Sequence, residues 1–265
     1  MSASRVPLSA CIIAMNEADR IGPCLESVSF CDEIVVVDSG STDGTQDLCR
    51  EAGAKVIETD WPGWIKQKNR AVDAASNDWI LALDADERVD DALRRAIEAL
   101  REAGLEGEGK PVGYYVARKV RYLGRWLRHG GWYPEWRMRL FDRRRAQWGG
   151  VDPHDHVYAD GPEAKIRDGD LEHHTYRSLE DQIRQINRHT TDAADDLYAR
   201  GKRSGIWPAV FRPPFHFVRH YLFRLGLLDG WAGFVMCGMR AYYVFLKYVK
   251  LWERTRAGDA TPDAG

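Results

Sequence analysis

Two groups of carboxylates in the first half of the chain are placed where a nucleotide and a cation can be held. An apolar run at 79–83 reads as a buried strand and leads directly into Asp84 and Asp86. Upstream, the apolar run 34–37 leads into Asp38 and a Gly/Ser-rich turn that opens a helix. Carboxylates at a strand end suit a divalent cation carrying phosphates, and such a turn suits a nucleotide. Together they predict a nucleotide site at the carboxyl edge of a parallel sheet.

Strand-like and helical segments alternate along the first hundred residues. Strands are expected at 8–15, 34–37, 55–58 and 79–83, and helices at 18–29, 45–52, 65–75 and 90–103. This alternation predicts an α/β fold with an open, mostly parallel sheet covered on both faces. Beyond 110 the pattern changes to strands at 113–122 and 138–141.

The composition limits the class of protein. A chain of 265 residues with 44% hydrophobic residues buries a full core and suits one domain with or without an appendage. Its net charge of -2 argues against nucleic acid as a partner. Five cysteines without a C-x-x-C pair favour a reducing compartment. Because the apolar stretch 10–15 reads as a strand rather than a signal peptide, we expect a cytoplasmic protein.

Four motifs in register resemble the family 2 glycosyltransferases, which have a GT-A fold. They are Ala14-Met15-Asn16-Glu17, the segment 37–45, Lys68-Asn69-Arg70-Ala71 and Leu83-Asp84-Ala85-Asp86-Glu87. Further stretches at 130–141, 173–176 and 245–248 resemble the bacterial lipopolysaccharide-core β-glucosyltransferases, so the likeness covers nearly the whole chain. The resemblance implies an inverting transfer of glucose from UDP-glucose to a lipid-anchored glycan such as the lipopolysaccharide inner core.

The resemblance also implies a donor site. We expect Asp86 to bind Mg²⁺ or Mn²⁺ directly, with Asp84 nearer the ribose, because a cation neutralises the charge that develops on the leaving diphosphate. Asp38 is expected to accept hydrogen bonds from a uracil-type base. Further donor contacts are expected from Ala14, Asn16, Glu17, Ser39, Lys68 and Ala85. The alternatives are that the acids only cap the helix that follows and that the lysine is a solvated surface residue.

One histidine is expected beside the cation. GT-A enzymes often place a histidine from the late part of the sheet on the metal, and His174, followed by a helical segment, resembles that position. The alternative is a structural histidine held by hydrogen bonds.

Two carboxylates are candidates for the base that deprotonates the acceptor hydroxyl. Glu135 precedes Trp136, and such apolar neighbours are expected to raise the pKa of this carboxyl. The alternative is that Glu135 forms a structural ion pair with Arg137 or Arg139. Asp155 is the competing base.

Residues 201–256 differ in composition from the rest of the chain. They contain ten Lys or Arg, two acids and thirteen aromatic residues, and their longest uncharged run is 230–239. That run is shorter than the roughly 20 residues of a spanning helix, whereas aromatic-basic segments of this kind lie in a bilayer interface. We therefore expect a glycosyltransferase domain at 1–200, a membrane-associating helical segment at 201–256 and a disordered tail at 257–265. The alternative is an ordinary helical appendage packed on the main domain or in a dimer contact.

Taken together, these features predict a metal-dependent enzyme, peripheral at the cytoplasmic face of the bacterial inner membrane. Its expected partners are a nucleotide-sugar donor, a lipid-linked glycan acceptor and an anionic membrane surface, with a homo-oligomer left open. Alternative acceptors are a polysaccharide repeat on a lipid carrier and a polyprenyl phosphate. The alternative from another class is a catalytically silent sugar-nucleotide-binding or scaffold protein, against which the intact pair Asp84 and Asp86 argues.

Overall fold

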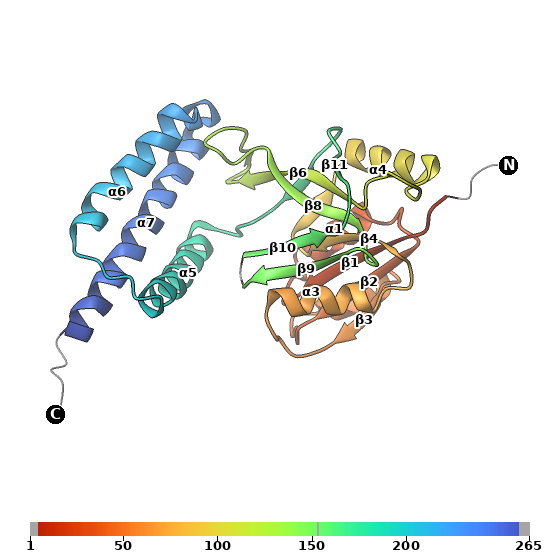
Figure 1. The fold of residues 1–265 in the computed structure, drawn as a ribbon, viewed down its shortest axis with the longest axis horizontal. Helices are drawn as coiled ribbons and strands as arrows, with labels where there is room; N and C mark the ends of the chain where they lie inside the picture. The colour runs from red at the N-terminus through yellow and green to blue at the C-terminus, as the bar shows by residue number, and fades with distance from the viewer. Residues whose placement is uncertain (1–4, 153, 260–265) are drawn as a thin grey trace. The chain divides into compact units, whose positions relative to one another are not determined.

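The computed structural model describes residues 5–152 and 154–259, and the chain divides into two compact units. The first unit comprises Met1–Lys119 and Pro134–His173. The second comprises Val120–Tyr133 and His174–Gly265. Figure 1 shows the strands of the first unit and the long helices of the second.

Four parallel strands, in the spatial order β3-β2-β1-β4, form one half of the sheet in the first unit. Their bounds are β1 (Leu8–Ala14), β2 (Glu33–Asp38), β3 (Lys55–Glu58) and β4 (Trp79–Asp84). The register pairs Ala14 of β1 with Asp38 of β2, and Ile13 of β1 with Asp84 of β4. Both acidic strand ends therefore lie at the same edge of the sheet, as the sequence predicts.

Helices cover both faces of these strands. They are α1 (Ile21–Ser27), α2 (Thr45–Glu51), α3 (Trp64–Asp73) and α4 (Asp91–Ala103). Successive strand residues point to opposite faces, so Ile12 of β1 packs in one apolar cluster with Ile97 of α4, while Ile13 packs in the other with Val72 of α3. The near-continuous apolar strands are thus buried on both sides, which confirms the expected α/β class.

Antiparallel strands extend the sheet beyond β4. They are β5 (Glu87–Val89), β6 (Gly113–Tyr122), β8 (Glu135–Asp142) and β12 (Leu171–His173), with β11 (Glu163–Lys165) pairing with β6. A separate hairpin consists of β9 (Ala146–Val151) and β10 (His154–Ala159). In this half, β6 pairs with β8 so that Arg118 lies opposite Glu135, and β12 pairs with β5 so that His173 lies opposite Glu87.

The second unit is mainly helical. It contains β7 (Arg125–Trp126), α5 (Leu179–Ala199), α6 (Trp207–Val218), a π-helical turn η1 (Arg219–Phe223), a 3-10 turn η2 (Gly226–Asp229) and α7 (Gly230–Asp259). Helix α7 packs against both α5 and α6 (Figure 1). The division into compact units falls after His173 rather than at residue 200, because α5 packs with the C-terminal helix α7. The expected domain boundary stays a prediction. Helix α7 includes 257–259 of the expected tail, and 260–265 lie outside the described residues.

No single helix in the described part of the chain has the length and apolar composition to span a membrane. The segments Trp207–Phe223 and Gly226–Ala257 meet that criterion only as a pair, with a bend of 75° between them.

Candidate active site

The loops that follow β1 and β2 are locked together by hydrogen bonds. The carbonyl of Ala14 accepts from the backbone N–H of Ser39 at 3.0 Å. The backbone N–H of Asn16 donates to Oγ of Ser41 at 2.7 Å, and Oδ1 of Asn16 accepts from the N–H of Thr42 at 2.9 Å. The fold thus brings the predicted donor-site residues Ala14, Asn16 and Ser39 to one place.

Asp38 is fully buried and organises the turn that follows it. Its Oδ1 accepts from the backbone N–H groups of Gly40 at 3.0 Å and Ser41 at 2.8 Å, and from Nε2 of Gln46 at 2.7 Å. Gly40 has a φ of +87°, a conformation that glycine adopts without a steric penalty. The observed role of Asp38 is to hold this turn, and its contact with a base stays a prediction.

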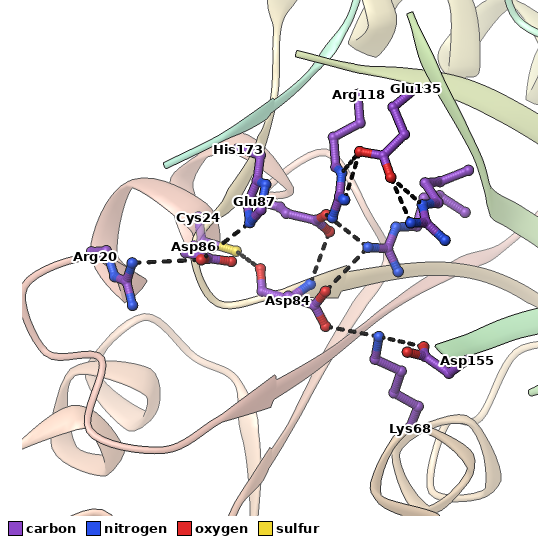
Figure 2. Close-up of polar contacts among 12 residues, drawn as sticks. Arg20, Cys24, Lys68, Asp84, Asp86, Glu87, Arg118, Glu135, Asp155 and His173 are labelled. Atoms are coloured by element: carbon purple, nitrogen blue, oxygen red, sulfur yellow. Dashed lines mark hydrogen bonds and ion pairs between the residues drawn. The ribbon is translucent and has the colours of Figure 1, made fainter. Parts of the chain in front are cut away.

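Asp84, at the end of β4, lies between two buried cations (Figure 2). Nζ of Lys68 lies 3.2 Å from its Oδ1, and Nη2 of Arg139 lies 3.1 Å from its Oδ2. Burial by itself raises the pKa of Asp84, but these cations outweigh that effect and hold the pKa well below its usual range. The carboxyl group is therefore ionised at neutral pH.

Asp86 lies beside His173 and Arg20. Nε2 of His173 is 3.3 Å from Oδ2 of Asp86, and Nη1 of Arg20 is 3.5 Å from the same oxygen. Burial raises the pKa of Asp86, but the His173 ring and Arg20 lower it by more, so the net shift is downward. The predicted ligand His174 belongs to the second unit, where its ring lies edge-on to Trp126 with centroids 5.6 Å apart. The structure therefore places His173 beside the candidate cation ligand.

Glu135 is clamped by two arginines. Nη2 of Arg118 is 2.7 Å from Oε2 of Glu135, and Nη2 of Arg137 is 2.5 Å from Oε1. Burial raises the pKa of Glu135, but the two guanidinium groups outweigh it and lower the pKa. The expected rise in pKa is therefore wrong. The structural pairing with Arg137 is confirmed, and Arg118 supplies the second partner because it lies directly opposite on β6.

Asp155 lines a pocket of the first unit with a cavity volume of about 470 Å³. The pocket wall consists of Lys68, Asp84, Tyr115, Arg118, Trp136, Arg137, Met138, Arg139, Trp148, Asp155, His156 and Val157. Nζ of Lys68 lies 2.8 Å from Oδ2 of Asp155 and 4.5 Å from the centroid of the Trp148 ring. Lys68 is 7% exposed, so it is a buried ion-pair partner rather than a solvated surface residue.

The sequence model described as Glycosyl transferase family 2 matches residues 9–162, which is more than half of the chain. The chain belongs to glycosyl transferase family 2. This membership confirms the expected enzyme class, a glycosyltransferase, and the expected fold.

Relatives of this glycosyltransferase extend the likeness beyond the matched domain. Over 262 residues it is 35% identical to LpsC of Rhizobium meliloti (strain 1021), a lipopolysaccharide core biosynthesis glycosyltransferase. The alignment covers 94% of this chain and 93% of LpsC. It is 28% identical over 255 residues to an uncharacterized glycosyltransferase of Rickettsia typhi, covering 93% and 87% of the two chains.

Two solved structures also align with the glycosyltransferase. One is glucosyl-3-phosphoglycerate synthase from Mycobacterium tuberculosis in complex with Mn²⁺, uridine-diphosphate and glucosyl-3-phosphoglycerate, at 28% identity, 46% coverage of each chain and a TM-score of 0.35. The other is S. aureus TarS, at 17% identity, coverage of 71% of this chain and 40% of TarS, and a TM-score of 0.47.

The residues at the sheet edge fit a divalent cation in part. Asp86 offers carboxylate oxygens and His173 an imidazole nitrogen, both of which bind divalent metals in proteins. Within 5–152 and 154–259 there is no group of three or more His, Cys, Asp or Glu side chains arranged to hold a metal. A cation here would therefore need further ligands from the donor diphosphate and water.

Two further side chains complete the site and were not predicted as part of it. Glu87, which is fully buried, accepts a hydrogen bond from Nη2 of Arg139 at 2.7 Å and another from Nη1 of Arg118 at 3.3 Å. Burial lowers the pKa of Arg139, but Glu87 and Asp84 raise it by more. The only sequence signal for these contacts was the presence of Arg137 and Arg139 after Glu135 on one strand. The partner strands could not be deduced from that signal.

The side chains of two predicted donor-binding residues, Ala85 and Glu17, are occupied by other contacts in the structure. The methyl group of Ala85 is buried in the apolar cluster above the sheet, which leaves its backbone for a ligand. The carboxylate of Glu17 pairs with Arg20, with Oε2 and Nε 2.6 Å apart, and its backbone N–H donates to Oγ1 of Thr45. A contact of either residue with the nucleotide stays a prediction.

Proposed function

We propose that this glycosyltransferase moves glucose from UDP-glucose, with inversion, onto a lipid-anchored glycan such as the lipopolysaccharide inner core. The 35% identity to LpsC over almost the full length of both chains supports this acceptor class. The observation that carries the chemistry is the bridge formed by Lys68 between Asp84 and Asp155. It joins the acidic end of the parallel sheet to a carboxylate in the adjoining pocket.

The donor side of the reaction rests on Asp86 and His173. These residues would hold Mg²⁺ or Mn²⁺, which would neutralise the negative charge that develops on the departing diphosphate. Lys68 and Arg139 keep Asp84 ionised through their ion pairs, and Lys68 would also contact phosphate oxygens of the donor. The bond that breaks joins the anomeric carbon to the diphosphate, and the diphosphate carries away the electron pair.

The acceptor side rests on Asp155. Each carboxylate oxygen of Glu135 is occupied by a guanidinium group, whereas Asp155 faces the pocket and pairs with the ammonium of Lys68. Donor phosphates that attract this ammonium would free Asp155 to accept the acceptor's hydroxyl proton as the oxygen attacks the anomeric carbon. We therefore assign the base to Asp155 and a structural role to Glu135.

The proposed location is the cytoplasmic face of the bacterial inner membrane, with the protein held at the membrane surface. An acceptor carried on a lipid requires the enzyme to work at that surface. The basic and aromatic composition of 201–256 supports this location.

A donor screen tests the function. The protein is incubated with nucleotide sugars, with and without Mg²⁺ or Mn²⁺, and nucleoside-diphosphate release is measured with core-truncated lipopolysaccharide as acceptor. Metal-dependent release that requires both UDP-glucose and the acceptor supports the proposal. Transfer only to a polyprenyl phosphate would change the acceptor, and no transfer from any donor would contradict the assignment.

A further inference from the structure

An exposed apolar stripe runs along α6 and into η1. Its members are Trp207, Phe211, Phe215 and Val218 of α6 and Leu222 of η1, all exposed and spaced by three or four residues. That spacing puts them on one face of the helix. Phe211, for example, is 65% exposed. Contiguous apolar surface of this extent marks an interaction site rather than ordinary surface.

The stripe continues around the turn into α7. The bend between the helices exposes Phe223, Leu225, Leu227 and Leu228, and the first turns of α7 expose Trp231 and Phe234. Phe223 is the most exposed of them, at 80%. We call residues 222–231 the apex of the α6–α7 hairpin.

Two polar groups of the apex, the Asp229 carboxylate and the Arg224 carbonyl, are paired within the second unit. Asp229 accepts from the backbone N–H of His129 at 2.9 Å and from that of Arg128 at 3.1 Å, and its side chain is 6% exposed. The carbonyl of Arg224 accepts from the N–H of Gly130 at 2.8 Å. Asp229 and this carbonyl can therefore enter an apolar medium at a lower cost than unpaired groups, whereas the exposed cation of Arg224 must stay at the headgroups.

Two cations of this segment, Lys250 and Arg254, form contacts within the second unit. Nζ of Lys250 contacts the carbonyl and Oδ1 of Asn187 and the hydroxyls of Thr190 and Thr191 at 2.6–2.8 Å. Arg254 pairs with Asp195. These contacts hold α7 to α5, so these two cations are not free to bind lipid headgroups. The number of Lys and Arg residues in 201–256 therefore overstates the electrostatic attraction of this segment to a membrane.

The length of the α6–η1 stretch suits a segment that enters a bilayer without crossing it. The 12 residues of α6 and the 5 of η1 form a continuous helical stretch. At about 1.5 Å per residue it is about 25 Å long, less than the roughly 30 Å of a bilayer's hydrocarbon core. The bent pair of helices, unlike either helix alone, has the length and composition of a membrane segment among the described residues.

We propose that the apex of the α6–α7 hairpin inserts into one leaflet of a phospholipid bilayer and leaves on the same side. The binding free energy comes mainly from the exposed apolar side chains, which enter the hydrocarbon of the bilayer. Exposed cations such as Arg219 lie near the headgroups. This insertion deepens the proposed function and rests on it in one respect, that the acceptor is carried on a lipid. We propose lipid, rather than a second copy of the chain, as the partner of the exposed stripe.

Vesicle flotation of the full chain tests the insertion. We expect binding to neutral phosphatidylcholine vesicles as well as to vesicles containing phosphatidylglycerol, retained at about 1 M NaCl, because salt screens charges and not apolar contacts. The double substitution Phe223→Asp and Leu228→Asp should weaken partitioning by about tenfold or more, since a carboxylate is costly in hydrocarbon. Val151→Asp is the matched control, because Val151 is 66% exposed on β9 of the other unit.

A second readout reports the depth directly. Leu228→Cys labelled with an environment-sensitive fluorophore should shift to shorter wavelength when vesicles are added, and Val151→Cys labelled in the same way should not. The unsubstituted chain serves as the labelling blank. Circular dichroism and thermal unfolding of each variant show whether it is folded.

Three outcomes would overturn the inference. They are binding restricted to anionic vesicles and lost at high salt, unchanged binding of the folded double variant, and a dimer that ignores vesicles and dissociates on the same substitutions. Sugar transfer to a soluble acceptor fragment separates this inference from the proposed function. Transfer without vesicle binding refutes the insertion alone, and vesicle binding without transfer from any donor refutes the function alone.

Discussion

Nζ of Lys68, on α3, lies 2.8 Å from Oδ2 of Asp155, on β10. The two residues are 87 positions apart in the chain, and the side chain of Asp155 is 14% exposed. An ammonium in this position compensates the charge of Asp155 until phosphate oxygens compete for it. We therefore propose that this pair links donor binding to the release of a base.

Asp155→Asn removes the proposed base. The rate of transfer should fall by roughly 10²-fold or more, because an amide cannot take the hydroxyl proton. Donor affinity should not fall, because the amide competes less with donor phosphates for the ammonium of Lys68. Steady-state transfer and calorimetric donor binding measure the two effects.

Glu135→Gln is the matched comparison. It should reduce transfer less than Asp155→Asn does and should lower stability, because Arg118 and Arg137 lose a charged partner. If both variants fold and the order of their rates is reversed, the base is Glu135 after all.

Asp86→Ala should abolish transfer and remove the dependence of nucleotide affinity on Mg²⁺ or Mn²⁺, because the diphosphate then meets the negative charge of Asp84 without a bound cation. Titration of UDP with and without metal measures the effect. Chelation of metal from the wild type should reproduce the loss of transfer. Full activity of the variant would exclude Asp86 as a ligand.

His173→Ala and His174→Ala separate two adjacent histidines. Only the first should weaken metal-dependent UDP binding, because Nε2 of His173 lies 3.3 Å from Asp86. Metal titrations monitored by UDP affinity decide between them. A larger effect of His174→Ala would restore the ligand predicted from the sequence.

Arg139→Met should lower the free energy of unfolding by about 3–5 kcal/mol, because it leaves Asp84 and Glu87 buried without their shared cation. Arg50→Ala is the control, since the exposed pairs of Arg50 with Asp47 and Glu58 are worth about 0–1 kcal/mol. Urea unfolding at neutral pH gives both values. Equal effects would show that the buried network contributes no more than a surface pair.

The pH dependence of stability follows from the lowered pKa of Glu135. A carboxyl whose pKa is lower in the folded state than its usual 4.5 stabilises the fold above that value, and this contribution is lost as the pH falls through the folded pKa. Wild-type stability should therefore drop below about pH 4.5, and Glu135→Gln should drop less steeply. Urea midpoints between pH 3 and 7 test this. Glu26→Gln, at an exposed position, should follow the wild type.

The sequence alone determined the parallel half of the sheet and the meeting of two acidic strand ends at one of its edges. Near-continuous apolar runs mark β1, β2 and β4, and their alternation with helices favours parallel pairing. Because parallel strands end at one edge, Asp38 and Asp84 had to meet there, and the register confirms it. These features depend on residues near one another in the chain.

Only the tertiary structure decided which side chains pair at the site. The pKa of Glu135 is lowered rather than raised, because Arg118 contacts it. Arg118 lies 17 residues away in the chain and is brought opposite Glu135 by the pairing of β6 with β8. The choice between His173 and His174 depends on where β12 ends, since successive strand residues point to opposite faces. Likewise, the composition of 201–256 predicted helices, but only their packing determines which apolar side chains stay exposed. Pairing, register and exposure arise from contacts distant in sequence, which local patterns do not encode.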